Sequence, residues 1–192
     1  MPNLVEEFLS SLGPEVTKKM SSNTNIDEGT LQQLLPVITP MILGGLKKQK
    51  DERGGQERVD HILNKYGNPS VLDNMDDLFK QKLNDNTTEP NLGGLLGNAG
   101  TDATNLLKNN FKIDSNMAGK LIPMLAPIVL GFLTKKRDSG TGSSGLAGLL
   151  DQDGDGSVLD DVAGLFLGNL GGSSKKSNPL TDLLGGVLGG KN

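Results

Sequence analysis

The sequence predicts an all-α protein: a multihelical bundle built from two sequence repeats with proline-broken central helices, followed by an acidic loop, one more helix and a glycine-rich tail. Three observations predict it. Apolar residues recur at helical spacing through most of the region 1–138. An apolar stretch with two prolines four positions apart occurs twice, at residues 34–46 and 121–133. About half of the 27 glycines lie beyond residue 138, where the composition changes.

The composition limits the core and the partners. A chain of 192 residues is long enough for a sizeable core, and with five Phe, one Tyr and no Trp that core must be aliphatic. The net charge is -4 and no basic face is interleaved with aromatics, so we expect no nucleic-acid partner. The absence of cysteine excludes disulfides and thiolate metal sites. The first residues lack the pattern of a signal peptide, so we expect a cytoplasmic protein, with export by another route left open.

The first repeat covers about residues 3–50. Residues 3–12 carry apolar side chains at helical spacing, and Pro14 restarts a helix because proline is tolerated at the first helical position. Asp27 is predicted as the N-cap of the next helix. Pro36 cannot donate to the helical ladder and disfavours helical geometry at the residue before it, so a kink or break is predicted there. A second apolar helix then continues to about residue 50.

The section between the repeats is more polar. Residues 50–55 are predicted as a turn, residues 58–66 and 70–83 as two amphipathic helices, and residues 84–90 as a linker. The helical part of this section, residues 56–83, therefore joins the two repeats within one domain at residues 1–138.

The second repeat covers about residues 91–137 and follows the first at a constant offset, so that Asp114 corresponds to the capping residue Asp27. Seven residues of the first apolar helix recur unchanged at this offset: Leu34, Pro36, Pro40, Leu43, Gly44, Leu46 and Lys48. The duplication predicts two pseudo-equivalent units whose apolar helices pack on each other. Both apolar runs, 34–46 and 121–133, are clearly shorter than the roughly 20 residues that a membrane span needs. We therefore interpret them as buried core helices.

The charged clusters outside the acidic loop are interpreted as solvated. Basic residues follow apolar runs at 47–50, 135–137 and 175–176, as expected for cations at helix C-termini. The carboxylate pairs Glu6-Glu7 and Asp76-Asp77 are placed on solvated helix faces.

Catalytic patterns are missing from the sequence. His61 is the single histidine and is expected at the surface or the core boundary rather than as a base. No P-loop, no Gly-x-Gly-x-x-Gly after a strand and no Gly-x-Ser-x-Gly elbow is found. We therefore predict no catalytic and no cofactor-binding residues, and we do not expect an enzyme.

The sharpest motif is the acidic run at residues 151–161, which fits the first six positions of an EF-hand-type calcium loop. Carboxylates at positions one, three and five converge on one point, glycine at position six permits the turn, and position seven offers its carbonyl. The bidentate Glu expected at position twelve is replaced by Val162. Asp160 or Asp161, at positions ten and eleven, must therefore complete the coordination shell of the ion. This shortening resembles the calcium loops of bacterial Excalibur-type modules. The predicted calcium ligands are Asp151, Asp153, Asp155, Ser157, Asp160 and Asp161.

The residues after 138 divide into two parts. Residues 139–172 hold a linker, the acidic loop and a predicted helix over 158–170, and residues 173–192 form a flexible tail with an amphipathic segment at 179–188. Glycines four positions apart make either a strip for close helix packing or a partly unfolded segment. These Gly/Leu-rich segments favour self-association into a homo-oligomer or binding of a protein partner; a membrane surface is the less favoured alternative.

Several of these features together resemble the YidB-like bacterial family of unknown function. They are the doubled apolar helix with its prolines, the Leu/Gly-rich segment at residues 93–97, and the run Asp-Gly-Asp-Gly-Ser-Val-Leu-Asp-Asp at residues 153–161. The resemblance covers about residues 4–170. It implies a multihelical fold with no known enzymatic activity and assigns no catalytic residue.

The function that the sequence predicts is therefore that of a non-enzymatic structural or interaction protein. It is expected to bind calcium at residues 151–161 and to associate with itself. The alternative is a peripheral membrane protein that uses the Gly/Leu-rich C-terminal segment.

Overall fold

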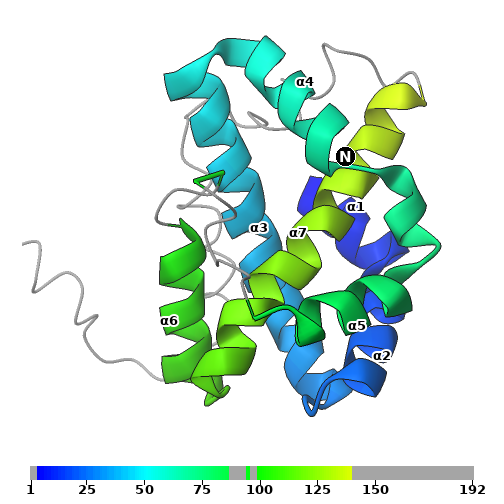
Figure 1. The fold of residues 1–192 in the computed structure, drawn as a ribbon, viewed down its shortest axis with the longest axis vertical. Helices are drawn as coiled ribbons and strands as arrows, with labels where there is room; N and C mark the ends of the chain where they lie inside the picture. The colour runs from blue at the N-terminus through cyan, green and yellow to red at the C-terminus, as the bar shows by residue number, and fades with distance from the viewer. Residues whose placement is uncertain (1–3, 87–93, 96–98, 140–192) are drawn as a thin grey trace, which may run out of the picture.

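The computed structural model describes residues 4–86, 94–95 and 99–139. Within these residues the chain forms seven α-helices and one 3₁₀ helix and contains no strand, so the predicted all-α class is confirmed (Figure 1). The acidic loop, the helix over 158–170 and the glycine-rich tail lie outside the described residues, as does most of the linker at 84–90.

The first two helices agree with the pattern that predicted them. Helix α1 spans Leu4–Ser11 and buries Leu4 and Phe8, which lie one helical turn apart on the same face. Helix α2 spans Gly13–Asn23 and carries its proline in the first turn, where the missing N–H has no intrahelical partner to lose.

Helix α3 corrects the prediction of a proline break. It spans Glu28–Arg53 as one helix with Pro36 and Pro40 inside it, and helix α7, Ser115–Asp138, likewise contains Pro123 and Pro127. An interior proline costs about 3 kcal/mol in helix propensity. Each fully buried aliphatic side chain contributes about 1.5–3 kcal/mol, and both helices bury such residues along most of their length. Core packing therefore outweighs the local preference to break.

The starts of both long helices confirm the capping prediction. The Asp27 carboxylate accepts a hydrogen bond of 2.9 Å from the Thr30 amide and one of 2.7 Å from the Thr30 hydroxyl. Asp114 accepts from the amides of Asn116 at 2.9 Å and Met117 at 3.3 Å. Each carboxylate occupies donors that the first helical turn leaves unsatisfied, so the start of the helix is encoded locally.

The middle section differs from its predicted boundaries. The turn after α3 is reduced to Gly54, at φ 137, because α3 continues to Arg53 and α4 begins at once as Gly55–Tyr66. The single helix predicted over 70–83 is two elements, the 3₁₀ helix η1 at Pro69–Leu72 and helix α5 at Met75–Asn84. Helix α6, Ala99–Phe111, then leads into α7.

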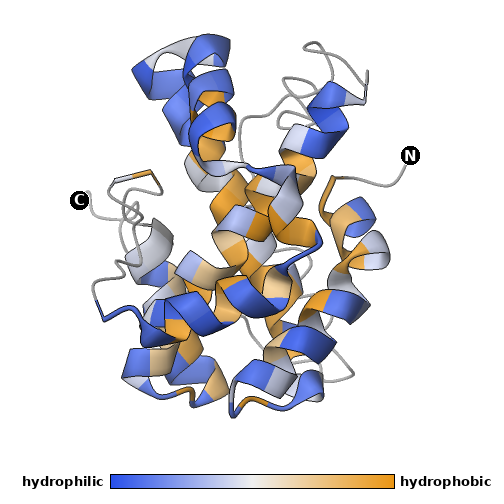
Figure 2. Cartoon of the chain, turned by 45° about the vertical axis from the view of Figure 1, so that its right-hand side comes forward, coloured by the Kyte–Doolittle hydropathy of each residue, from blue (hydrophilic) through white to orange (hydrophobic). Residues whose placement is uncertain are grey.

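The core is aliphatic and lies around α3 and α7, which contact each other. Figure 2 shows the hydrophobic residues along these central helices and the hydrophilic residues on the outward-facing turns. The shorter helices α1, α2, α4 and α6, together with η1 and α5, pack against one or both of the central pair or against each other. Gln49 on α3 donates a hydrogen bond of 3.1 Å to the Gly94 carbonyl, and the neighbouring Leu95 is buried in the core.

Helix α7 is long and apolar enough to cross a membrane by length and composition, and it is the one such helix among the described residues. The helix is continuous over 24 residues and is therefore longer than the apolar run at 121–133 indicated. Its most apolar window is nevertheless 78% buried within the fold, as expected for the core helix of a helical bundle.

Candidate functional site

The predicted calcium ligands Asp151, Asp153, Asp155, Ser157, Asp160 and Asp161 all lie outside the described residues. Within residues 4–86, 94–95 and 99–139, no group of three or more His, Cys, Asp or Glu side chains is placed to hold a metal ion. The calcium site therefore stays a prediction from the sequence, and the described helices offer a different feature.

That feature is a pocket of about 310 Å³ where α1, η1 and the C-terminal end of α7 meet. We call it the α1–α7 pocket; its lining residues are Ser11, Leu12, Leu72, Phe132, Lys135, Lys136 and Ser139. Nothing in the sequence signals it, because its walls come from three segments that are far apart along the chain. Only the packing of α1 and η1 against α7 brings them together.

The floor of the pocket is apolar. Leu72 and Phe132 are each 7% exposed, and Leu12 is half-buried at the junction between α1 and α2. The Phe132 ring meets the ring of Phe8 edge to face, with 5.4 Å between their centroids and 70° between their planes. Such a pair fixes the floor, since edge-to-face contact adds about 0.5–1.5 kcal/mol to the burial of the two rings.

The rim of the pocket is cationic because Lys135 and Lys136 line it, and the contacts of these residues and of the neighbouring Arg137 correct the interpretation of the basic cluster at 135–137. Lys136 forms an ion pair with Glu7 on α1. Arg137 donates a hydrogen bond of 2.9 Å from Nη2 to Asn64 Oδ1 and lies 3.6 Å from Asp60 Oδ1, both on α4. Two of these three cations therefore tie the end of α7 to neighbouring helices, whereas Lys135 is exposed as predicted.

The basic cluster at 47–50 is also less solvated than predicted. Lys47 is only 9% exposed, and its ammonium donates a hydrogen bond of 2.8 Å to Asp51 one turn later. In contrast, Lys48 is exposed and lies 3.9 Å from the exposed Glu52. Lysine can be buried in this way because its apolar stem packs on the core while its charged end reaches a carboxylate.

The carboxylate pairs Glu6-Glu7 and Asp76-Asp77 are less solvated than predicted. Asp77 is exposed, but Asp76 accepts hydrogen bonds from Lys19 Nζ at 3.0 Å and Asn23 Nδ2 at 2.8 Å, both on α2. These bonds from Lys19 and Asn23 lower the pKa of the Asp76 carboxyl, and the bond to Asp76 raises the pKa of Lys19. Likewise Glu7 forms an ion pair with Lys136 on α7, so at least one carboxylate of each pair joins two helices.

The lowered pKa of Asp76 predicts how its contribution to stability depends on pH. The contribution is present above the ordinary carboxyl value near 4 and is lost as pH falls through the lower pKa of the folded state. Asp76→Asn is therefore expected to weaken the acid destabilisation of the protein, by a small amount because solvent screens the partly exposed pair. Urea unfolding at pH 7 and pH 3 measures this difference.

Asp77→Asn is the matched control for that experiment, because it removes the same charge from an exposed position of the same helix turn. It should leave the acid destabilisation as it is in the unmodified protein. Equal effects of the two substitutions would contradict a specific role for the bonds between Asp76 and α2.

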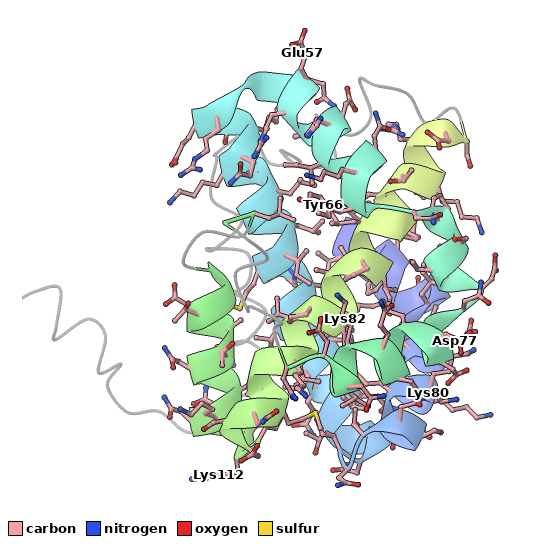
Figure 3. The ribbon with its side chains drawn as sticks, in the orientation of Figure 1. Glu57, Tyr66, Asp77, Lys80, Lys82 and Lys112 are labelled. Carbon is pink, nitrogen blue, oxygen red and sulfur yellow. The ribbon has the colours of Figure 1, made fainter. Side chains whose placement is uncertain are left out.

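No described residue group resembles a catalytic constellation. His61 is exposed, as predicted. The pKa shifts of Lys19, Asp27 and Asp76 all favour the charged form at neutral pH, which is the behaviour of structural ion pairs and caps rather than of proton-transfer groups. Figure 3 shows Glu57 and Lys112 projecting from opposite ends of the bundle, away from any shared site.

Comparison with known proteins gives a family match. The sequence model of the family described as "Bacterial protein of unknown function (DUF937)" matches residues 6–136 and 133–192. No curated protein and no solved structure matches the chain.

Proposed function

Since the chain belongs to this bacterial family of unknown function, we propose its role from its own residues: a non-enzymatic structural or interaction protein that binds calcium at residues 151–161 and associates with itself through its C-terminal segments. The observation that carries the proposal is the contrast between the two parts of the chain. In the described helices, ion pairs between side chains of opposite charge join neighbouring helices, whereas residues 151–161 hold five aspartates without one basic residue.

The calcium proposal rests on charge and spacing. Aspartates at alternate positions repel one another unless a cation lies between them, and a hard divalent cation prefers several oxygen ligands. The ligands proposed are Asp151, Asp153, Asp155, the carbonyl of Ser157, and Asp160 or Asp161, with the glycine at position six making the turn. Because the loop is short and lacks a closing Glu, its dissociation constant should be on the order of 10⁻⁵ to 10⁻³ M.

Self-association is proposed for the Gly/Leu-rich segments, above all the amphipathic segment at 179–188. Two Gly-Gly pairs four positions apart would let another helix approach closely, and Val187 and Leu188 between them supply apolar contact. No observation on the described helices favours the alternative of membrane association, because the one helix among them that is apolar enough for a membrane is buried in the core.

Calcium binding is tested by isothermal titration of the full chain. Titration with calcium should give a heat of binding with a dissociation constant in the range above, and Asp153→Ala combined with Asp155→Ala should abolish it by removing two converging carboxylates. Asp77→Ala combined with Asp102→Ala is the matched control, because it removes two exposed carboxylates outside the loop.

Either of two results would contradict the proposed calcium site. They are no heat of binding in the unmodified protein at millimolar calcium, or the same heat of binding in the loop variant and in the control. Sedimentation velocity on the same samples measures self-association separately. A monomer at every concentration would refute that part of the proposal and leave calcium binding intact.

A further inference from the structure

The α1–α7 pocket has the composition of a docking site for an amphipathic segment. Its floor is made by Leu12, Leu72 and Phe132, and both charged residues that line it, Lys135 and Lys136, are cations. Lys136 already pairs with Glu7, but Lys135 is exposed with no ionic partner among the described residues. An occupant that fits must therefore bring apolar side chains for the floor and a carboxylate for the rim.

We propose that the occupant is the chain's own segment at residues 158–170, bound within the same molecule. This segment carries an apolar stripe at helical spacing, made by Leu159, Ala163, Phe166 and Leu170. Asp160 and Asp161 lie at the start of the stripe. One of them would close the calcium loop, which leaves the other to pair with Lys135.

The length of the connecting chain favours docking within one molecule. The described part of the chain ends at Ser139, which itself lines the pocket, and 19 residues along the chain lead from there to residue 158. A glycine-rich chain of that length spans about 22–26 Å on average, from roughly 5–6 Å times the square root of the number of residues. A tether this short holds the segment at a millimolar effective concentration, so a second molecule competes poorly in dilute solution.

The terminal segment at 179–188 fits the pocket less well. Its tether from Ser139 is about twice as long, and it brings one carboxylate, Asp182, and no aromatic ring. The inference is therefore separate from the proposed self-association, because it uses another segment and leaves 179–188 available to a second copy.

The chain has no cysteine, so single pairs of engineered cysteines can report which surfaces meet. In the full chain, Ser11→Cys places a thiol at the pocket wall, and Leu167→Cys places one at the edge of the apolar stripe. Docking should join them in a disulfide within one chain under mild oxidation. Non-reducing electrophoresis separates this product from a disulfide between two chains.

The matched control is Asn64→Cys with Leu167→Cys. Asn64 is exposed, lies outside the pocket, and contacts Arg137 close to Ser139, so the tether brings the segment near it just as readily. The pocket pair should form its disulfide at least tenfold faster than this control pair. Adding Phe166→Ser to the pocket pair should lower its rate of disulfide formation to that of the control pair. This substitution changes no residue of the described helices.

Equal rates in the two pairs, or no effect of Phe166→Ser, would overturn the proposal. A disulfide that forms mainly between chains would assign the pocket to a second copy and would also overturn docking within one molecule. None of these outcomes depends on the heat of calcium binding or on the sedimentation of the unmodified chain, so the inference and the proposed function fail independently.

Discussion

Replacing Gly67 with alanine is expected to destabilise the protein by about 3 kcal/mol, because a methyl group has no space there. Gly67 ends α4, with its amide 2.8 Å from the Leu63 carbonyl, and lies against α7. A Cβ atom would lie 2.8 Å from the backbone oxygens of both Leu63 and Leu130 and would collide with the hydroxyl of Thr134. Backbone atoms of two packed helices cannot move aside cheaply, so α4 and α7 would have to separate.

The effect comes from space and not from backbone strain, since Gly67 has a φ of -98, which alanine adopts readily. Gly13→Ala is the control, because a Cβ at Gly13 would meet only Leu9 Cβ, at an ordinary distance of 3.9 Å. It should change the free energy of unfolding by less than about 0.5 kcal/mol. Chemical denaturation measures both variants, and similar values would mean that α4 and α7 do not approach as closely as described.

Phe8→Ala is the second substitution with a large expected effect, a loss of about 3–5 kcal/mol. Phe8 is 1% exposed and gives α1 its edge-to-face contact with Phe132 on α7. Helix α1 has only eight residues and buries two of them, Leu4 and Phe8, so the Phe8 ring supplies a large share of the apolar contact that holds the helix in place. A helix so short is unstable by itself in water, and loss of the ring should release α1 from the bundle.

Phe111→Ala provides the comparison, because it makes the same change at the end of α6, where the side chain is only partly buried. It should cost clearly less in the free energy of unfolding. Faster amide hydrogen exchange along α1, but not along α3, should accompany Phe8→Ala. Uniform exchange across both helices would show that α1 is an inseparable part of the cooperative core.

The predictions that succeeded depend on residues close together in the chain. Asp27 and Asp114 bond to amides two or three positions away, so each long helix begins where its cap predicted. Pro14 lies in a first turn for an equally local reason. The spacing of apolar residues identified helices and the aliphatic core, because one apolar face per helix must be buried whatever its neighbours are.

The predictions that failed considered only residues close together in the chain and left out contacts with distant residues. Pro36 and Pro123 do weaken the helical ladder, yet the buried side chains around them are held by residues far along the chain. The sequence predicts solvated positions for Lys136 and Asp76, because their partners, Glu7 and Lys19, belong to helices distant in the sequence. The α1–α7 pocket could not be predicted for the same reason.

The helical class, the helix starts and the aliphatic character of the core follow from the sequence, because caps and apolar periodicity act within a few residues. Packing between distant segments decided that the central helices continue through their prolines, that α4 meets α7 at Gly67, and that the cations at the end of α7 join three helices. Those outcomes depend on the free energy of contacts between distant segments, and these contacts exist only once the segments are packed together.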